Sequence, residues 1–271
     1  MQHIIFFSGG AASYLTAKRV VKKNGAKNCL LVFADTGIED TNTYEFIKLA
    51  SKKLSVNLIR LKPFNKDPWD IYMDKKFLNH RVSFCSQELK IKPCRNYVEQ
   101  TFTPSDCTLY LGIDFNEIER GEAIAKHWNP YIVQFPLCEN KWATREDYFR
   151  EIRKDGLKIP PLYGLGFSHN NCGGFCVKAG KKQFAKLLKY FPDRYAYHEN
   201  REQEFMKSVG KKTGVIIRDY RANAPDSTIS LKEFREEIEA EQKKKGYLEP
   251  SLFSDEAMGG CGCFTTATAK Q

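Results

Sequence analysis

Serine and glycine residues at the end of the first apolar run have the chemistry to hold an anion. Residues 4–7 are apolar and lead into Ser8, Gly9 and Gly10, and Ser13 follows where a helical pattern begins. Two glycines allow a tight turn that exposes backbone N–H groups, and the first turn of a helix adds unpaired amides and a positive dipole end. We therefore expect Ser8, Gly9, Gly10 and Ser13 to bind phosphate. An ordinary strand-to-helix turn is the alternative.

A second polar turn follows the second apolar run. Asp35, Thr36 and Gly37 come directly after residues 29–34. A carboxylate at a strand end can accept hydrogen bonds from ribose hydroxyls or hold a magnesium ion beside phosphates, and glycine allows close backbone approach. We expect these three residues to contact a nucleotide, and the alternative is a turn with a helix N-cap.

Cysteine is frequent in this chain, with nine residues among 271. An odd number in a chain without a secretion signal argues against a disulfide framework, so buried thiols, metal ligation and redox chemistry remain open. Cys172 and Cys176 flank a Gly-Gly-Phe segment whose backbone amides could face their sulfurs. Structural thiols are the alternative to metal ligation.

The elements that must position these residues alternate along the chain. Apolar runs predict strands at residues 4–7, 29–34, 56–61, 108–112 and 131–135. Three- and four-residue periodicity predicts helices at residues 11–23, 41–54 and 87–102, then at 142–153 and 178–190. This pattern predicts an α/β fold with a doubly wound parallel sheet, in which ligands bind at the carboxyl ends of the strands.

Composition limits the class of protein. The chain is 42% hydrophobic and 28% charged, with a formal net charge of +10, which favours an anionic partner such as a nucleotide or nucleic acid. No apolar run reaches the roughly 20 residues that cross a bilayer, so we expect a cytoplasmic protein without a membrane partner. We expect a nucleotide-binding α/β domain with a cysteine site at residues 1–180. A mostly helical region should follow at residues 181–271, with a capping box at Ser230 and Glu233 and a flexible tail.

Several collinear motifs resemble one enzyme family. The Ser-Gly-Gly-x-x-Ser turn resembles the pyrophosphate loop (PP-loop) of the adenine nucleotide alpha-hydrolase superfamily. Four further stretches resemble its phosphoadenosine phosphosulfate (PAPS) reductase branch: residues 33–39 with Asp-Thr-Gly, 81–93, 111–120 and 163–176. Through this resemblance Gly112 and Arg120 join the expected nucleotide-binding residues. The resemblance implies the PP-loop fold, ATP with Mg²⁺ or a sulfonucleotide as ligand, and an enzyme.

The family also implies roles for cysteines. Cluster-containing members hold a 4Fe-4S centre with an early and a late cysteine pair, which places Cys85, Cys172 and Cys176 as three metal ligands. A fourth ligand would come from Cys94, Cys261, Cys263, His169 or a non-protein group, and zinc is the alternative metal. Sulfonucleotide reductases carry a nucleophilic cysteine on a mobile tail, which makes Cys261 and Cys263 the candidate catalytic residues. Cluster ligation and an inert tail are the alternatives for these two.

The chain also departs from the family pattern. The family's Glu-Cys-Gly-Leu/Ile-His ending is missing, Ala12 stands where the loop usually has an acidic residue, and Asp114 stands where the family has an arginine. We expect sulfonucleotide reduction or related sulfur transfer. The alternatives are an ATP pyrophosphatase that adenylates a carbonyl, such as one on a nucleic-acid base, for sulfur insertion, and a non-catalytic nucleotide sensor. The reductase would take a dithiol reductant protein as its partner, whereas sulfur insertion would take tRNA or DNA. Formation of a homodimer is left open.

Overall fold

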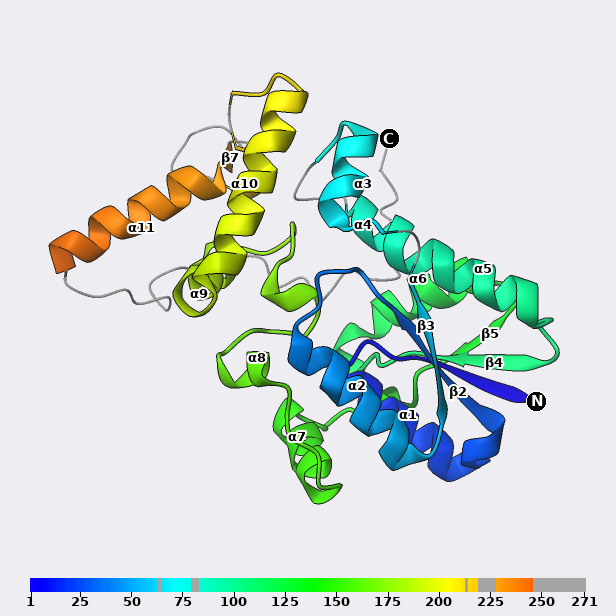
Figure 1. Ribbon diagram of the computed structural model, residues 1–271. Coiled ribbons are helices and arrows are strands. Elements are labelled where there is room, and N and C mark those ends of the chain that lie inside the picture. The colour runs from blue at the N-terminus through cyan, green and yellow to red at the C-terminus, as the bar shows by residue number, and fades with distance from the viewer. Residues whose placement is uncertain (63–64, 79–82, 213, 219–227, 246–271) are drawn as a thin grey trace.

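A computed structural model describes residues 1–62, 65–78, 83–212, 214–218 and 228–245. Its centre is a sheet of five parallel strands in the order β3-β2-β1-β4-β5 (Figure 1). The strands are β1 Gln2–Phe6, β2 Cys29–Ala34, β3 Asn57–Leu61, β4 Cys107–Tyr110 and β5 Ile132–Gln134. In these described ranges, no helix combines the length and apolar character needed to span a membrane. The predicted parallel α/β fold is confirmed.

Helices cover both faces of the sheet, as the doubly wound pattern predicts. Ile5 and Phe7 lie in one core with side chains of α1 (Ala11–Asn24), α2 (Thr41–Leu54) and α7 (Arg145–Lys154). Ile4 and Phe6 point to the other face and share a core with α5 (Lys92–Thr101) and α6 (Ile118–Trp128). Alternate residues of β1 are therefore buried on opposite faces, because side chains of a strand alternate in direction.

The chain between β3 and β4 is more irregular than its sequence pattern predicts. It forms α3 (Pro68–Lys75), α4 (Phe84–Ser86), a π-helical turn η2 (Gln87–Ile91) and α5. The single predicted helix at residues 87–102 thus begins earlier and contains a π turn. The helix α3, which the sequence pattern does not indicate, begins with Asp67 in a capping box and Pro68 in the first turn.

Helices dominate the chain after β5. They are α7, α8 (Pro161–Gly164), α9 (Lys181–Tyr190), α10 (Pro192–Ser208) and α11 (Leu231–Lys245), with a small antiparallel pair of β6 (Ile217–Arg218) and β7 (Thr228–Ile229). The helices predicted at 142–153 and 178–190 therefore each begin three residues later. The Ser230–Glu233 capping box is confirmed: Ser230 N donates to Glu233 Oε2 at 2.7 Å, and Glu233 N donates to Ser230 Oγ at 3.1 Å.

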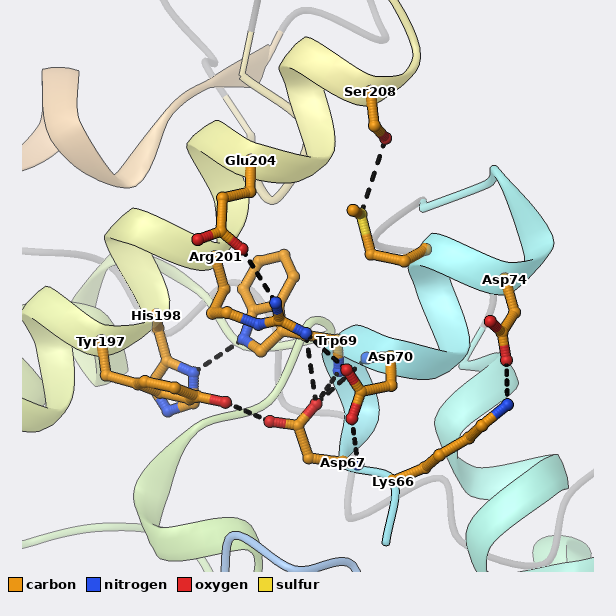
Figure 2. A network of polar contacts seen from close by, with 11 residues as sticks. Lys66, Asp67, Trp69, Asp70, Asp74, Tyr197, His198, Arg201, Glu204 and Ser208 are labelled. Atoms are coloured by element: carbon orange, nitrogen blue, oxygen red, sulfur yellow. Dashed lines mark hydrogen bonds and ion pairs between the residues drawn. The ribbon is translucent and has the colours of Figure 1, made fainter. Parts of the chain in front are cut away.

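A third apolar core joins the helical region to α3. It combines Trp69 and Tyr72 of α3, Phe175 of the loop before α9, and side chains of α9, α10 and α11. Figure 2 shows the polar contacts along this junction. Trp69 Nε1 donates to His198 Nδ1 at 2.9 Å, and Arg201 reaches Asp70 at 2.7 Å. This core contains residues from both sides of residue 180, where the sequence analysis divides the chain into two regions. The division itself stays a prediction.

Candidate functional site

The loop of residues 8–13, here called the glycine loop, connects β1 to α1 at the carboxyl edge of the sheet. Neighbouring β1 and β4 mark the point where the strand order reverses, which is where open α/β sheets bind ligands. Gly9 has a φ of +76°, and a Cβ there would lie 2.8 Å from Thr43 Cγ2. Ser13 Oγ donates to the Gly10 carbonyl at 2.9 Å. The turn therefore depends on glycine, as the sequence pattern predicts.

Most amides of this loop have no hydrogen-bond acceptor among the residues that the structure describes. Ala11 N donates to the Tyr163 hydroxyl at 3.1 Å. Within the described ranges no protein acceptor is recorded for the amides of Gly9, Gly10, Ala12 and Ser13. Amides of this kind at a helix N-terminus form an anion-binding site. The arrangement suits the phosphates of a nucleotide.

Gly112 follows β4 and packs against the first turn of α1. A Cβ at this position would lie 2.7 Å from Ser13 N and 2.8 Å from the Ala12 carbonyl carbon. Those atoms are backbone, so they could not move aside without shifting the loop. Gly112 therefore adjoins the glycine loop, and its role there is to allow this close contact.

Asp35 directly follows β2, and hydrogen bonds from the protein hold its carboxylate. Its Oδ1 accepts from Gly37 N at 2.9 Å and from the Tyr44 hydroxyl at 2.8 Å. Its Oδ2 accepts from Arg60 Nε at 2.8 Å. Burial raises the pKa of Asp35, but these hydrogen bonds outweigh burial and lower it. The structure thus shows Asp35 stabilising the turn of Thr36 and Gly37, and its contact with a nucleotide stays a prediction.

Three predicted thiols line one cleft. Cys85, Cys172 and Cys176 share it with Thr36 and Lys90, around about 440 Å³ of space not filled by atoms. Side chains from α4, η2 and the loop before α9 meet here, although they are far apart in the sequence. We call this the thiol cleft. The structure therefore brings together the three cysteines that the sequence analysis grouped.

Lys90 connects the thiol cleft to the strand ends. It lines the thiol cleft and also a second recess formed by the ends of β1 and β2 with Ser8 and Glu39. Its Nζ lies 3.6 Å from Cys172 Sγ. Glu39 accepts from the Cys172 amide through Oε2 and from Thr36 Oγ1 at 3.0 Å through Oε1. One buried ammonium thus stands between the glycine loop and the thiols.

The backbone at the thiol cleft has an unusual shape. Cys172, Gly173 and Gly174 have φ values of +54°, +58° and +88°. A Cβ on Gly173 would lie 2.7 Å from the Ile38 carbonyl oxygen. Cys172 is therefore a non-glycine residue in the left-handed region, a conformation that L residues seldom adopt and that is common at functional sites.

The protonation of these thiols reflects their burial. Burial raises the pKa of Cys85 to about 11, and it raises the pKa of Cys172, where the Lys90 ammonium partly offsets the rise. The Tyr72 hydroxyl donates to Cys85 Sγ at 2.9 Å. Without an added cation these thiols are neutral at pH 7, and a neutral thiol is a poor nucleophile.

The thiol cleft has donors that suit a thiolate-bound metal group, but they are not assembled into a metal site. Among the described residues, no three His, Cys, Asp or Glu side chains are arranged to hold one metal ion. Three soft sulfur donors are the ligands of iron–sulfur clusters and zinc. The 4Fe-4S cluster, and zinc as its alternative, stay predictions, and no reaction step below passes through them.

Some of the remaining predicted site residues make contacts within the protein, and others lie outside the described residues. Arg120 lies in α6 and pairs with Glu117 through Nη1. Asp114, which occupies the position of the family's arginine, accepts from Asn116 N at 3.1 Å and caps a short turn. Cys261 and Cys263 lie outside the described residues, so their catalytic role stays a prediction. The contribution of Arg120 to nucleotide binding stays a prediction.

Sequence reasoning missed several residues that shape the site. Asn170 Nδ2 donates to the Gly9 carbonyl at 3.3 Å and to Thr43 Oγ1 at 2.9 Å, so it connects the glycine loop to α2 and to the segment leading to Cys172. Arg194 donates to the Gly173 carbonyl and pairs with Asp40 at 2.8 Å. Most of these contacts join residues more than 100 positions apart, so spacing along the chain gives no signal of them.

Comparison with known proteins gives one family match. A family profile described as the phosphoadenosine phosphosulfate reductase domain matches residues 2–177. Two uncharacterized proteins of Methanocaldococcus jannaschii are each 24% identical, over 220 and 247 residues, covering 79% and 88% of this chain and 44% and 55% of theirs. An uncharacterized nin region protein of Escherichia phage lambda is 29% identical over 146 residues, which are 44% of this chain and 50% of that protein. The chain spans about half the length of these relatives.

Two solved structures are among those to which the chain shows some similarity. One is phosphoadenylyl-sulfate reductase from Candida auris in a phosphate complex, with a TM-score of 0.45 and 13% identity over 62% of this chain and 80% of that one. The other is the NH3-dependent NAD synthetase from Campylobacter jejuni, with a TM-score of 0.39 and 11% identity over 78% of this chain and 84% of that one.

Proposed function

Because the chain belongs to the phosphoadenosine phosphosulfate reductase family, a branch of the PP-loop superfamily, we propose that it binds an adenine nucleotide and performs sulfur chemistry. The glycine loop would hold the phosphates of the nucleotide, and the thiol cleft would be the site of sulfur transfer. The observation that supports this most strongly is Lys90, which lines both the recess beside Ser8 and the thiol cleft. One ammonium group thus lines both the recess beside the loop that would hold phosphate and the cleft that contains the thiols.

The reaction that we propose first is reduction of adenylyl sulfate or phosphoadenylyl sulfate. A cysteine thiolate of the enzyme attacks the sulfur, the bond from sulfur to the phosphate oxygen breaks, and the nucleotide leaves with that oxygen. The product is an enzyme thiosulfonate. A dithiol protein then supplies two electrons, becomes a disulfide and releases two protons, so that sulfite leaves and the enzyme thiolate is restored. Cys261 and Cys263 are the proposed nucleophiles.

The protein's contribution to the first step is electrostatic. Charge develops on the phosphate oxygen as the bond to sulfur breaks, and preorganised amides stabilise such charge better than water does. The open amides of Gly9, Gly10, Ala12 and Ser13 would hold the nucleotide phosphates. Lys90, which lines the recess beside Ser8, would add a positive charge between the phosphates and the thiols.

A second reaction deserves a test because of Asp114. A carboxylate that caps its own turn occupies the place of the family's arginine, which lowers the positive charge available to a sulfate group. In the alternative reaction, ATP is attacked at its α-phosphorus by a carbonyl oxygen of a nucleic-acid base, and pyrophosphate leaves. A sulfur nucleophile then replaces AMP. Magnesium would stabilise the leaving pyrophosphate.

Two assays on one anaerobic preparation test these reactions. Adenylyl sulfate and phosphoadenylyl sulfate, each with a thioredoxin-type dithiol, should yield sulfite, whereas ATP with tRNA or DNA should yield pyrophosphate only if the second reaction holds. Iron and acid-labile sulfide should exceed zinc in the same preparation. Absence of both products, together with no binding of any adenine nucleotide, would contradict the proposed function.

A further inference from the structure

The Tyr163 hydroxyl stands directly over the glycine loop. It accepts from Ala11 N at 3.1 Å, and it lies 3.1 Å from the point where a Cβ on Gly10 would be. A phenol is both an acceptor and a donor, and the Ala11 amide uses it as an acceptor. Its proton needs an acceptor of its own.

That proton has no recorded acceptor in the parts of the chain that the structure describes. Burial raises the pKa of Tyr163, so the hydroxyl keeps its proton at neutral pH. The Phe149 ring, at 5.0 Å between ring centroids, packs against Tyr163 and restricts its movement. The hydroxyl is thus a fixed, neutral hydrogen-bond donor beside amides that suit an anion.

Arg145 provides a positive charge at the same place. Its guanidinium carbon lies 5.9 Å from the centre of the Tyr163 ring. On the same helix, Arg150 pairs with Asp147 at 3.1 Å and Arg153 pairs with Glu146 at 2.7 Å. For Arg145 no ion pair is recorded with any residue that the structure describes. Its charge is therefore available to a ligand that reaches Tyr163.

The glycine loop itself contains no charged residue to bind an anion. Residues 8–13 contain no lysine or arginine, and the first turn of α1 has no acidic residue. We propose that Tyr163 and Arg145 complete the phosphate site: the hydroxyl donates to a phosphate oxygen held by the loop amides, and the guanidinium neutralises its charge. This inference rests on the proposed nucleotide binding and assigns two residues outside the loop to it.

Calorimetric titration of Tyr163→Phe and Arg145→Gln with pyrophosphate, ATP and adenosine tests the assignment. Phenylalanine keeps the ring and removes the hydroxyl. A hydrogen bond to a charged group is worth about 1.5–3 kcal/mol, so the affinity for pyrophosphate and ATP should fall about 10-fold or more, with adenosine unaffected. Arg145→Gln should cause a similar loss and weaken the dependence of ATP binding on salt.

Two matched variants serve as controls. Tyr190→Phe removes a hydroxyl at the end of α9, and Arg150→Gln removes a paired arginine of α7. Both should bind ATP like the wild type. If Tyr163→Phe unfolds, Arg145→Gln still decides the assignment, because its side chain is exposed.

The other outcomes of these titrations would overturn the inference, each for a different reason. Wild-type affinity in both variants would show that the two side chains do not touch the phosphates. Higher affinity in Tyr163→Phe would show that the hydroxyl instead competes with phosphate for the Ala11 amide. A wild-type protein that binds ATP keeps the proposed nucleotide site in either case, whereas a wild type that binds neither ATP nor a sulfonucleotide removes both proposals.

Discussion

Single residues determine whether the glycine loop can form. Gly112 and Gly9 stand where no side chain fits, since a side-chain carbon on either would lie within 3 Å of other atoms. Tyr163 and Asn170 then hold the loop through hydrogen bonds to Ala11 and Gly9. The proposed anion site would therefore be built mainly from backbone atoms whose positions depend on a few neighbours.

Gly112→Ala tests this dependence. The added methyl group would meet Ser13 N at 2.7 Å, so the start of α1 must shift. Overpacking of this kind costs about 1–3 kcal/mol of stability, and we expect nucleotide affinity to fall about 10-fold or more because the amides lose their alignment. Gly164→Ala is the control, since nothing lies within 4 Å of its added carbon. Urea unfolding and calorimetry measure both effects, and unchanged binding in Gly112→Ala would contradict the role of this contact.

The sequence indicated the glycine loop through its local order, and the family resemblance grouped Cys85, Cys172 and Cys176, which line one cleft. Ser8, Gly9 and Gly10 follow a strand, and that local order was sufficient to place the loop. The Arg60 and Tyr44 partners of Asp35 were not predictable, because nothing in the sequence indicates which side chains will donate hydrogen bonds to its carboxylate. The same holds for Tyr163 and Arg145, whose importance comes from contacts across the fold.

At the scale of elements, periodicity predicted the sheet and its covering helices well. The strand at residues 29–34 and the helix at 41–54 have the predicted bounds, because each has a long regular pattern with clear ends. The helix α3 was missed because its eight residues give too short a window for a period to emerge. It is stabilised instead by packing of Trp69 against His198 and Phe175 from distant elements.

His198 makes this junction sensitive to acid. The ring is 1% exposed, accepts from Trp69 Nε1 and stacks on Phe175 with 3.8 Å between ring centroids. Burial lowers the pKa of His198 to about 3. Because the pKa in the folded state lies below that in the unfolded state, the stabilisation is complete above about pH 6.5 and decreases as pH falls toward 3.

His198→Gln should remove much of this acid sensitivity. Glutamine stays neutral and keeps an acceptor for Trp69. Between pH 7 and pH 5 the wild type should lose about 2 kcal/mol of unfolding free energy that the variant does not lose, measured by urea titration at each pH. His127→Gln, at a partly exposed position of α6, should keep most of the wild-type dependence. Identical pH dependence of wild type and His198→Gln would show that protonation of this ring does not destabilise the fold.

The whole molecule is organised around three apolar cores. Two lie on opposite faces of the parallel sheet, and the third joins α3 to α9, α10 and α11. Cys172 and Cys176 lie in the loop before α9, while Cys85 comes from α4, the short helix after α3. The glycine loop begins α1, which packs on one face of the sheet. Nucleotide binding and thiol chemistry would thus use elements of the sheet and of the helical region, with Lys90 lining both recesses.

Amide resonances of the glycine loop provide the most direct test of this account. In ¹⁵N-labelled protein, addition of ATP or adenylyl sulfate should shift the Gly9 and Gly10 N–H signals strongly, and pyrophosphate alone should reproduce most of that shift. Glycines remote from the loop, such as Gly156 and Gly210, should not respond. If a bound nucleotide leaves the Gly9 and Gly10 signals in place, its phosphates are held elsewhere, and the central claim is wrong.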